Sequence, residues 1–318
     1  MRNIFFFFLT IIIISCNESP KPTKETVVEN NGVSLVVLGT TQDGGSPHIG
    51  CKKTCCEDLF KNPDKTRKVV SLGLIDSETQ KTYILEATPD FTEQIKTLNS
   101  VAPFEHKETP DGIFITHAHI GHYTGLMYLG KEALGANGVA TYVMEKMDTF
   151  LRTNGPWSQL VSEKNILLNE MQNDKPVVLS KKLSIEPLLV PHRDEYSETV
   201  GFLIKGEKKK VLFIPDIDKW SKWDTEIVQM VKVVDFAFLD ATFYDAAEIN
   251  NRDISLIPHP FVIESMQIMK GLKPEDKKKV HFIHFNHTNP LLNKSSDAYK
   301  TVIENGFNVS QYKEIFKI

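Results

Sequence analysis

The chain has 318 residues, which is long enough for one large domain or two small ones. With 41% hydrophobic and 25% charged residues, it has the composition of a globular protein. Its formal net charge of −4 provides no broad basic field, which argues against nucleic-acid binding through counterion release. The basic run KGEKKK (residues 205–210) is short, and it predicts a solvated hairpin turn between two strands rather than a binding patch.

The first sixteen residues, MRNIFFFFLTIIIISC, have the pattern of an export signal. One positive charge precedes an apolar run from Ile4 to Ile14 that is too short to span a bilayer comfortably. The run ends in IISC, which resembles the lipobox of bacterial lipoproteins and predicts lipidation of Cys16. We therefore expect a lipoprotein signal peptide at 1–16, a polar tether at 17–31, and an exported protein whose lipid anchors it to a bacterial membrane, facing the periplasm or the cell surface. An uncleaved anchor with an incidental cysteine is the alternative.

The stretch VSLVVLG (33–39) predicts a buried strand, and an irregular Gly-containing loop follows it. This loop carries Cys51, Cys55 and Cys56 within six positions of one another. An odd number of thiols in an exported protein argues against a disulfide framework, and a bridge between the adjacent Cys55 and Cys56 would be strained. Three clustered thiols suit a zinc ion with one further ligand, and exposed reactive thiols are the alternative.

Strands and helices alternate along the rest of the chain. The patterns predict strands at 71–76, 83–87, 112–116, 139–143, 183–192, 198–206, 209–216, 235–243 and 280–285. They predict helices at 89–98, 124–134, 145–154, 224–233, 261–272 and 295–306. We expect Asp90 to cap the first of these helices and Gly306 to close the last. Two similar halves without a low-complexity linker in 32–318 predict one α/β domain of two sheets flanked by helices.

The segment FITHAHIGHYTGL (114–126) contains three histidines at the end of a predicted strand. His117 and His119 are two residues apart, so they can project the same way and share one cation, whereas His122 turns toward a neighbouring position. Polar residues also end other predicted strands, namely His192, Asp216, Asp240 and His284. Because loops at strand ends commonly build the sites of layered α/β domains, we expect these side chains to meet. Imidazole and carboxylate ligands suit zinc, iron or manganese.

The order HAHIGH, VPHRD, IPDID and HFIHF resembles the H-x-H-x-D-H signature of the metallo-β-lactamase superfamily, which is followed by a distant His, an Asp and a last His. Within that superfamily the chain is similar to pyrroloquinoline quinone biosynthesis protein B and its phosphodiesterase relatives over most of residues 33–318. The similarity includes LGTTQDGGSPHIGCKKTCC, ATPDFTEQI, THAHIGHYTGL, FLDATFYDAAEI and HFIHFNHTNPLL. It implies an αββα sandwich of two mixed β-sheets flanked by helices.

The resemblance also assigns ligands to two metal sites that share Asp216 as a bridge. The first site would use His117, His119 and His192. The second would use His122, His284 and the aspartate of the signature, but this chain has Gly121 at that position. We therefore expect the first site to be complete and the second to lack one anionic ligand, so that Gly121→Asp should raise the affinity for a second metal.

Further roles follow from the same resemblance. A structural zinc in the phosphodiesterase relatives implies the ligand set Cys51, Cys55, Cys56 and His287. The relatives have C-x-C-x-x-C where this chain has C-x-x-x-C-C, so Cys55 is out of register and His48 could replace it. His259 is expected to bind an anionic oxygen or to protonate a leaving group, with a solvent-facing residue at a helix start as the alternative. Asp240 is expected to orient a ligand histidine from behind.

Three functions are compatible with these features. The first is metal-dependent hydrolysis of a small-molecule phosphodiester or related ester, with Asp216 and His259 as catalytic residues, one or two catalytic zinc ions and one structural zinc. The second is iron-dependent hydroxylation of a tyrosine-derived precursor in quinone-cofactor synthesis, with iron or manganese in the histidine site. The third is a non-catalytic metal-binding lipoprotein, for which Gly121 is the best support. In each case we expect contact with the membrane only through the N-terminal lipid.

Overall fold

The computed structural model describes residue 28 and residues 31–249 and 257–318. The predicted signal peptide, Cys16 and nearly all of the predicted tether lie outside these residues. Within the described part of the chain, no helix is both long enough and apolar enough to cross a membrane.

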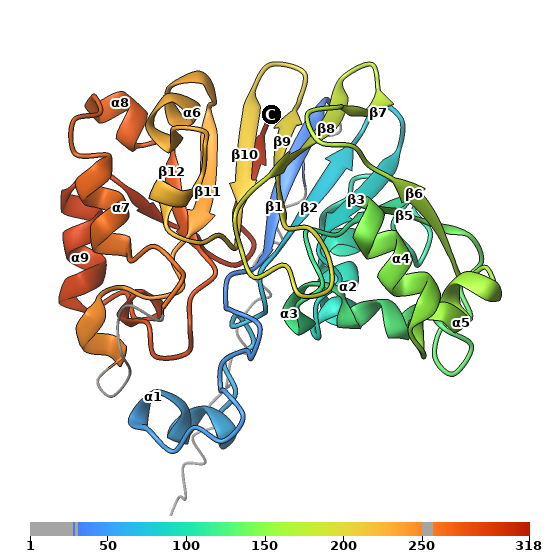
Figure 1. Ribbon diagram of the computed structural model, residues 1–318, viewed down its shortest axis with the longest axis horizontal. Helices are drawn as coiled ribbons and strands as arrows, with labels where there is room; N and C mark the ends of the chain where they lie inside the picture. The colour runs from blue at the N-terminus through green and yellow to red at the C-terminus, as the bar shows by residue number, and fades with distance from the viewer. Residues whose placement is uncertain (1–27, 29–30, 250–256) are drawn as a thin grey trace, which may run out of the picture.

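Two mixed β-sheets pack face to face in the centre of the molecule (Figure 1). The first sheet has the strand order β14 (Ile315–Lys317), β1 (Val33–Gly39), β2 (Ser71–Asp76), β3 (Lys81–Leu85), β4 (Gly112–Phe114), β5 (Val139–Val143) and β6 (Ile166–Glu170). The second has the order β13 (Asn308–Val309), β12 (Val280–Ile283), β11 (Phe236–Asp240), β10 (Lys210–Ile214), β9 (Val200–Lys205), β8 (Leu183–Leu189) and β7 (Val177–Ser180). The two C-terminal strands are divided between the sheets, so the end of the chain ties them together.

Helices cover the outer face of each sheet, as Figure 1 shows. The first sheet is covered by α2 (Phe91–Val101), α3 (Ile120–Tyr123), α4 (Glu145–Thr153) and α5 (Trp157–Ser162). The second is covered by α6 (Ile227–Val233), α7 (Val262–Ile268), α8 (Pro274–Lys277) and α9 (Asp297–Glu304). The short helix α1 (Thr54–Glu57) lies in the loop after β1 and projects at the lower end of the view.

The strand side chains alternate between two environments, which builds the layers. In β1, Val33, Leu35 and Val37 face the second sheet, whereas Val36 and Leu38 face the helices. Strand β10 divides its residues in the same way between the inter-sheet core and the helices of the other side. Because β1 and β10 are buried on both faces, each reads in sequence as a continuous apolar run. The predicted αββα arrangement is confirmed.

Most of the expected elements are present, with shifts at their ends. The run 205–210 is the predicted hairpin turn, since β9 and β10 pair antiparallel across it. The predicted helix at 124–134 is wrong: the chain forms a 3₁₀ helix over Thr124–Leu129 and then turns at Gly130. Gly125 and Gly130 both lower helix propensity there. Asp90 occupies the N-cap position of α2, but its carboxylate accepts a hydrogen bond from the amide of Val69 instead of capping the helix.

Candidate metal centre

The candidate site residues lie at the C-terminal ends of strands that point the same way. In the first sheet, β1 and β3 are both antiparallel to β2, and β3 is parallel to β4. In the second sheet, β8 and β10 are both antiparallel to β9, and β10, β11 and β12 run parallel. The loops that follow these strands therefore meet at one edge of the sandwich.

The first ligand set surrounds one oxygen of Asp216. This oxygen, Oδ2, lies 3.2 Å from His192 Nε2, 3.4 Å from His117 Nε2 and 3.8 Å from His119 Nδ1. Burial alone raises the pKa of Asp216, but His192 and His259 outweigh it and hold this pKa well below 3.8. The carboxylate is therefore anionic at neutral pH, and the set offers three imidazole nitrogens and one oxygen to a cation.

A second set lies on the other side of Asp216, and it includes a carboxylate that the sequence did not reveal. Asp43 Oδ1 lies 3.0 Å from His122 Nε2 and 3.5 Å from His284 Nε2, and Asp216 Oδ2 lies 3.9 Å from His122 Nε2. Burial alone raises the pKa of Asp43, but His122 and His284 outweigh it and hold this pKa well below 3.8. Besides the shared Asp216, a second carboxylate therefore faces His122 and His284, although residue 121 of the signature is glycine.

Several candidate ligand atoms of these sets have no hydrogen-bond partner in the described part of the chain, so a metal ion would satisfy them better than the neighbouring side chains do. His117 Nε2, His122 Nε2, His284 Nε2 and Asp43 Oδ1 are buried and have no hydrogen-bond partner within the described residues. Each buried polar atom without a partner costs about 1–3 kcal/mol. One ligand atom per residue lies within 4.8 Å of the others in each set, so a cation in each would satisfy all of these atoms.

A second ring of contacts selects which histidine nitrogen faces inward. Thr116 Oγ1 lies 2.9 Å from His117 Nδ1, Asp218 Oδ1 3.3 Å from His192 Nδ1, and Thr242 Oγ1 2.8 Å from His284 Nδ1. Glu86 Oε1 lies 3.4 Å from His122 Nδ1, and Glu195 Oε2 3.3 Å from His119 Nε2. Such contacts fix ring orientation and raise ligand basicity in metal sites.

His259 lies beside the two sets and contacts two carboxylates, those of Asp240 and of the shared Asp216. Its Nδ1 is 2.9 Å from Asp240 Oδ2 and 3.2 Å from Asp216 Oδ1. Asp240 also accepts hydrogen bonds from the amide and hydroxyl of Thr242, which contacts His284. Asp240 thus contacts His259 directly and His284 through Thr242. Because Nδ1 faces the carboxylates, Nε2 is the His259 nitrogen left for a ligand.

The three thiols and His287 form a separate cluster. Cys51 Sγ lies 3.8 Å from Cys55 Sγ, and Cys55 Sγ lies 3.9 Å from Cys56 Sγ. One ligand atom from each thiol and from His287 lies within 4.8 Å of the others. Cys55 is therefore part of the cluster, whereas His48 stacks on the His287 ring with 4.4 Å between ring centroids. Burial, reinforced by His48 and Lys53, lowers the pKa of His287 to about 4, which leaves the ring neutral, as a metal ligand must be.

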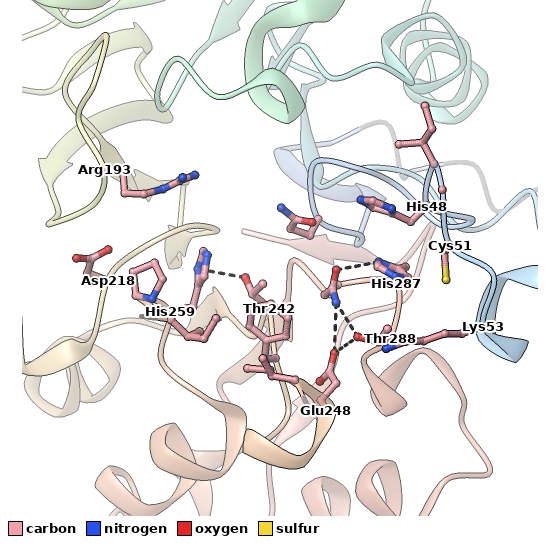
Figure 2. Close-up of a pocket in the computed structure, with 18 of the residues that line it drawn as sticks. His48, Cys51, Lys53, Arg193, Asp218, Thr242, Glu248, His259, His287 and Thr288 are labelled. Carbon is pink, nitrogen blue, oxygen red and sulfur yellow. Dashed lines mark hydrogen bonds between the residues drawn. The ribbon is translucent and has the colours of Figure 1, made fainter. Parts of the chain in front are cut away.

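A pocket of about 920 Å³ connects the metal centre to the thiol cluster (Figure 2). His259 and Thr242 line it on the metal side, and His48 and His287 on the other. Its charged lining is mostly cationic, with Lys52, Lys53, Arg193 and Lys222 against the two carboxylates of Asp218 and Glu248. Figure 2 shows Arg193 and Lys53 on opposite sides of the open space. The pocket is therefore suited to a ligand with negative charge next to the candidate metal ions.

The sequence profile of the Beta-lactamase superfamily domain matches residues 81–285, more than half of the chain. The chain belongs to this superfamily. It is 23% identical over 301 residues to coenzyme PQQ synthesis protein B of Acinetobacter baumannii (strain ACICU), covering 87% of this chain and 97% of that protein.

Two solved structures share the fold of this superfamily member. Zn²⁺-bound PqqB from Methylobacterium extorquens has a TM-score of 0.73 and 17% identity, covering 90% of this chain and 100% of that one. A diphosphatase of the PhnP family has a TM-score of 0.60 and 20% identity, covering 90% and 97%. At these identities the likeness shows the fold, and it confirms the predicted metallo-β-lactamase sandwich.

Several residues of the centre were not identified from the sequence. Asp43 stands in TTQDGG, which predicts only an irregular loop, and Glu86 is the polar residue of an apparent strand, YILEA. Asp218 and Thr242 stand two residues after Asp216 and Asp240, and that spacing is the only local signal that they support the site. His117, His119 and His122 were identified because a short, unusual spacing marks them, whereas His192 and His284 were identified from their places at strand ends and from the resemblance to the superfamily signature.

Proposed function

We propose that this superfamily member is a metal-dependent hydrolase that acts on a small anionic ester, most simply a phosphodiester. The observation that carries the proposal is the placement of two ligand sets around one shared oxygen, Asp216 Oδ2, beside a pocket with cationic walls. Zinc suits nitrogen-rich sites of this kind, and manganese and iron are the alternatives.

The proposed chemistry divides between the cations and the protein. Divalent cations held by the two ligand sets would lower the pKa of a water molecule and would stabilise charge that develops on an ester oxygen. Asp216 keeps both ligand sets close together and lies where it can orient the attacking water. We expect His259 Nε2 to donate a proton to the leaving group, and the contact of His259 Nδ1 with Asp240 supports this role by fixing the ring.

The charge of the pocket supports an anionic substrate. Arg193 and Lys53 line its two sides, and Arg193 lies one residue after the ligand His192. Lys222 also lines the pocket, but its charge is engaged by Asp218 at 2.7 Å. Guanidinium and ammonium groups on opposite walls suit a phosphate with a further polar substituent.

A second candidate is a reaction in quinone-cofactor synthesis. It is favoured by the name of the relatives, coenzyme PQQ synthesis protein B, and by their match over 97% of their length. Iron-dependent hydroxylation would need one metal with open positions. Gly121 gives weaker support to a single-metal hydroxylase or to a purely metal-binding role, because Asp43 brings a carboxylate to His122 and His284.

Metal content and ester hydrolysis together test the proposal. The full chain, purified in mild detergent without added metal, should contain two or three zinc ions by plasma mass spectrometry and should hydrolyse bis(p-nitrophenyl) phosphate. Iron in the histidine sets without diesterase activity would favour the hydroxylase. Zinc only in the thiol cluster, abolished by Cys51→Ser but not by His117→Ala, would favour a binding protein.

We further propose that the protein is exported and lipidated at Cys16. The support is the sequence alone: a charged start, a short apolar run and IISC. The tether of polar residues would hold the folded domain away from the membrane surface, so that a soluble ester could reach the pocket.

A further inference from the structure

Gly121 and Asp43 compete for the same space. A Cβ atom added to Gly121 would lie 2.4 Å from Asp43 Oδ1 and 2.6 Å from Asp43 Cα. Both distances are far below any ordinary van der Waals contact. A side chain at residue 121 is therefore incompatible with the present position of Asp43, and not only with its rotamer, because the backbone of Asp43 is also in the way.

The carboxylate of Asp43 faces the Nε2 atoms of His122 and His284, the two histidines of the second ligand set. Its Oδ1 lies 3.0 Å from His122 Nε2 and 3.5 Å from His284 Nε2. All three atoms are buried without a hydrogen-bond partner within the described residues. Two imidazole nitrogens and a carboxylate oxygen that converge in this way without hydrogen-bond geometry are what a cation between them would require.

The backbone holds Asp43 in this place. The amide of Phe285 donates to Thr40 O at 2.8 Å, and the amide of Gln42 donates to Phe285 O at 2.8 Å. The loop after β1 is thereby fixed to the residue that follows the ligand His284. These backbone hydrogen bonds fix the segment that carries Asp43. A fixed segment can position its side chain precisely enough to bind a metal ion.

We propose that Asp43 is the anionic ligand of the second metal site, and that it replaces the signature aspartate whose position is Gly121. This inference rests on the proposed metal-dependent function. The signature has its carboxylate at the position of Gly121 in helix α3, whereas this chain has it in the loop after β1. Residue 121 is glycine because that loop occupies the space of a side chain there. The second site is complete, with two imidazoles, Asp43 and the shared Asp216.

Three single variants of the full chain test the assignment with metal alone. Asp43→Asn keeps the shape but removes the charge, and Gly121→Ala adds an uncharged methyl group that displaces Asp43. Gly121→Asp adds the carboxylate that the signature would have. Zn²⁺ is titrated against a chromophoric chelator to obtain stoichiometry and successive affinities. Asp64→Asn, on an exposed carboxylate that pairs with Arg67, is the matched control.

Asp43→Asn should weaken the second histidine-site ion by more than about a hundredfold, beyond the cost of losing an outer-shell partner, while the first ion is retained. Gly121→Ala and Gly121→Asp should both weaken the second ion, and Asp64→Asn should leave both unchanged. Retained first-site binding and an unchanged circular dichroism spectrum show that each variant is folded. Exchange coupling between two Mn²⁺ ions, seen by electron paramagnetic resonance, should vanish in Asp43→Asn.

Wild-type second-ion affinity in Asp43→Asn, or a raised affinity in Gly121→Asp, would overturn the assignment. The result is separate from the proposed reaction. A second ion that depends on Asp43, in a protein that hydrolyses no ester, would refute the hydrolase and leave the assignment of Asp43 as a ligand in place.

Discussion

Asp216 Oδ2 lies 3.2 Å from His192 Nε2, and the same oxygen lies 3.9 Å from His122 Nε2 of the other ligand set. One carboxylate oxygen thus faces both candidate sites. Asp216→Asn should therefore lower metal content by up to two ions per chain and leave only the thiol-cluster ion, because both sites lose the shared charge. Metal content by plasma mass spectrometry measures this.

Asp218→Asn is the matched control for that variant. Asp218 contacts His192 from behind, at 3.3 Å from Nδ1, and does not face the ion. It should weaken the first site alone, by about tenfold to a hundredfold. Equal losses in the two variants would show that Asp216 is not shared.

His259 contacts the carboxylates of Asp216 and Asp240, and it is expected to act on the substrate. On the proposed function, His259→Asn should lower kcat for a diester by about 10² to 10⁴ while the zinc content stays the same. Metal content and kcat measured on one preparation separate the two roles. Loss of an ion in this variant would instead make His259 a ligand, since Asp216, Asp240 and His259 also lie close enough to bind one.

The structural zinc could be held by Cys55 or by His48 in addition to Cys51, Cys56 and His287, and two variants distinguish these ligand sets. Because Cys55 lies in the cluster and His48 stacks on His287 from outside, Cys55→Ser should remove one zinc per chain and His48→Ala should not. The cluster ties the loop after β1 to the segment after β12, so Cys55→Ser should also lower the melting temperature, by about 5 °C or more. The opposite pattern of zinc loss would assign the fourth ligand to His48.

Lipidation is tested on the part of the chain that precedes the folded domain. In bacterial cells fed labelled palmitate, the wild-type protein should take up label and sediment with membranes. Cys16→Ser should lose the label, because no thiol remains at the predicted cleavage site. Label retained in Cys16→Ser would rule out this modification site, and Cys51→Ser controls for labelling of other thiols.

The sequence was informative wherever a local pattern determines the structure. Continuous apolar runs marked strands such as β1 and β10, because both faces of each sheet are covered. His117 and His119 were recognisable because two residues on one strand end project together. The fold, and the meeting of these histidines beside Asp216, could therefore be predicted.

Asp43 could not be predicted in this way. Its role arises because the loop after β1 is hydrogen-bonded to Phe285, so residues 43 and 284 meet although 241 positions of the 318-residue chain separate them. Nothing in TTQDGG encodes that contact. Gly121 was correctly seen as a departure from the signature, but the sequence alone made the departure look like a loss, whereas in the structure it makes room for a carboxylate from elsewhere.

A buried histidine away from the metal centre should make stability depend on pH. His281 lies in β12 against Phe238 and Phe316, and its Nδ1 has no hydrogen-bond partner within the described residues. Burial lowers its pKa to about 4 from an ordinary 6.5. Since the unfolded chain binds a proton at this site more readily than the folded chain, the stability is fully present above pH 6.5 and is lost as the pH falls toward 4.

His281→Phe removes this titration and keeps the aromatic contacts. Between pH 7 and pH 4 the wild type should lose about 3 kcal/mol more free energy of unfolding than the variant, because the pKa of His281 is about 4 in the folded chain and 6.5 in the unfolded chain. Urea unfolding at a series of pH values measures the difference, in which acid effects common to both proteins, including those of the metal ligands, cancel. Parallel losses of stability in the two proteins would show that His281 titrates in the folded chain much as it does in the unfolded one.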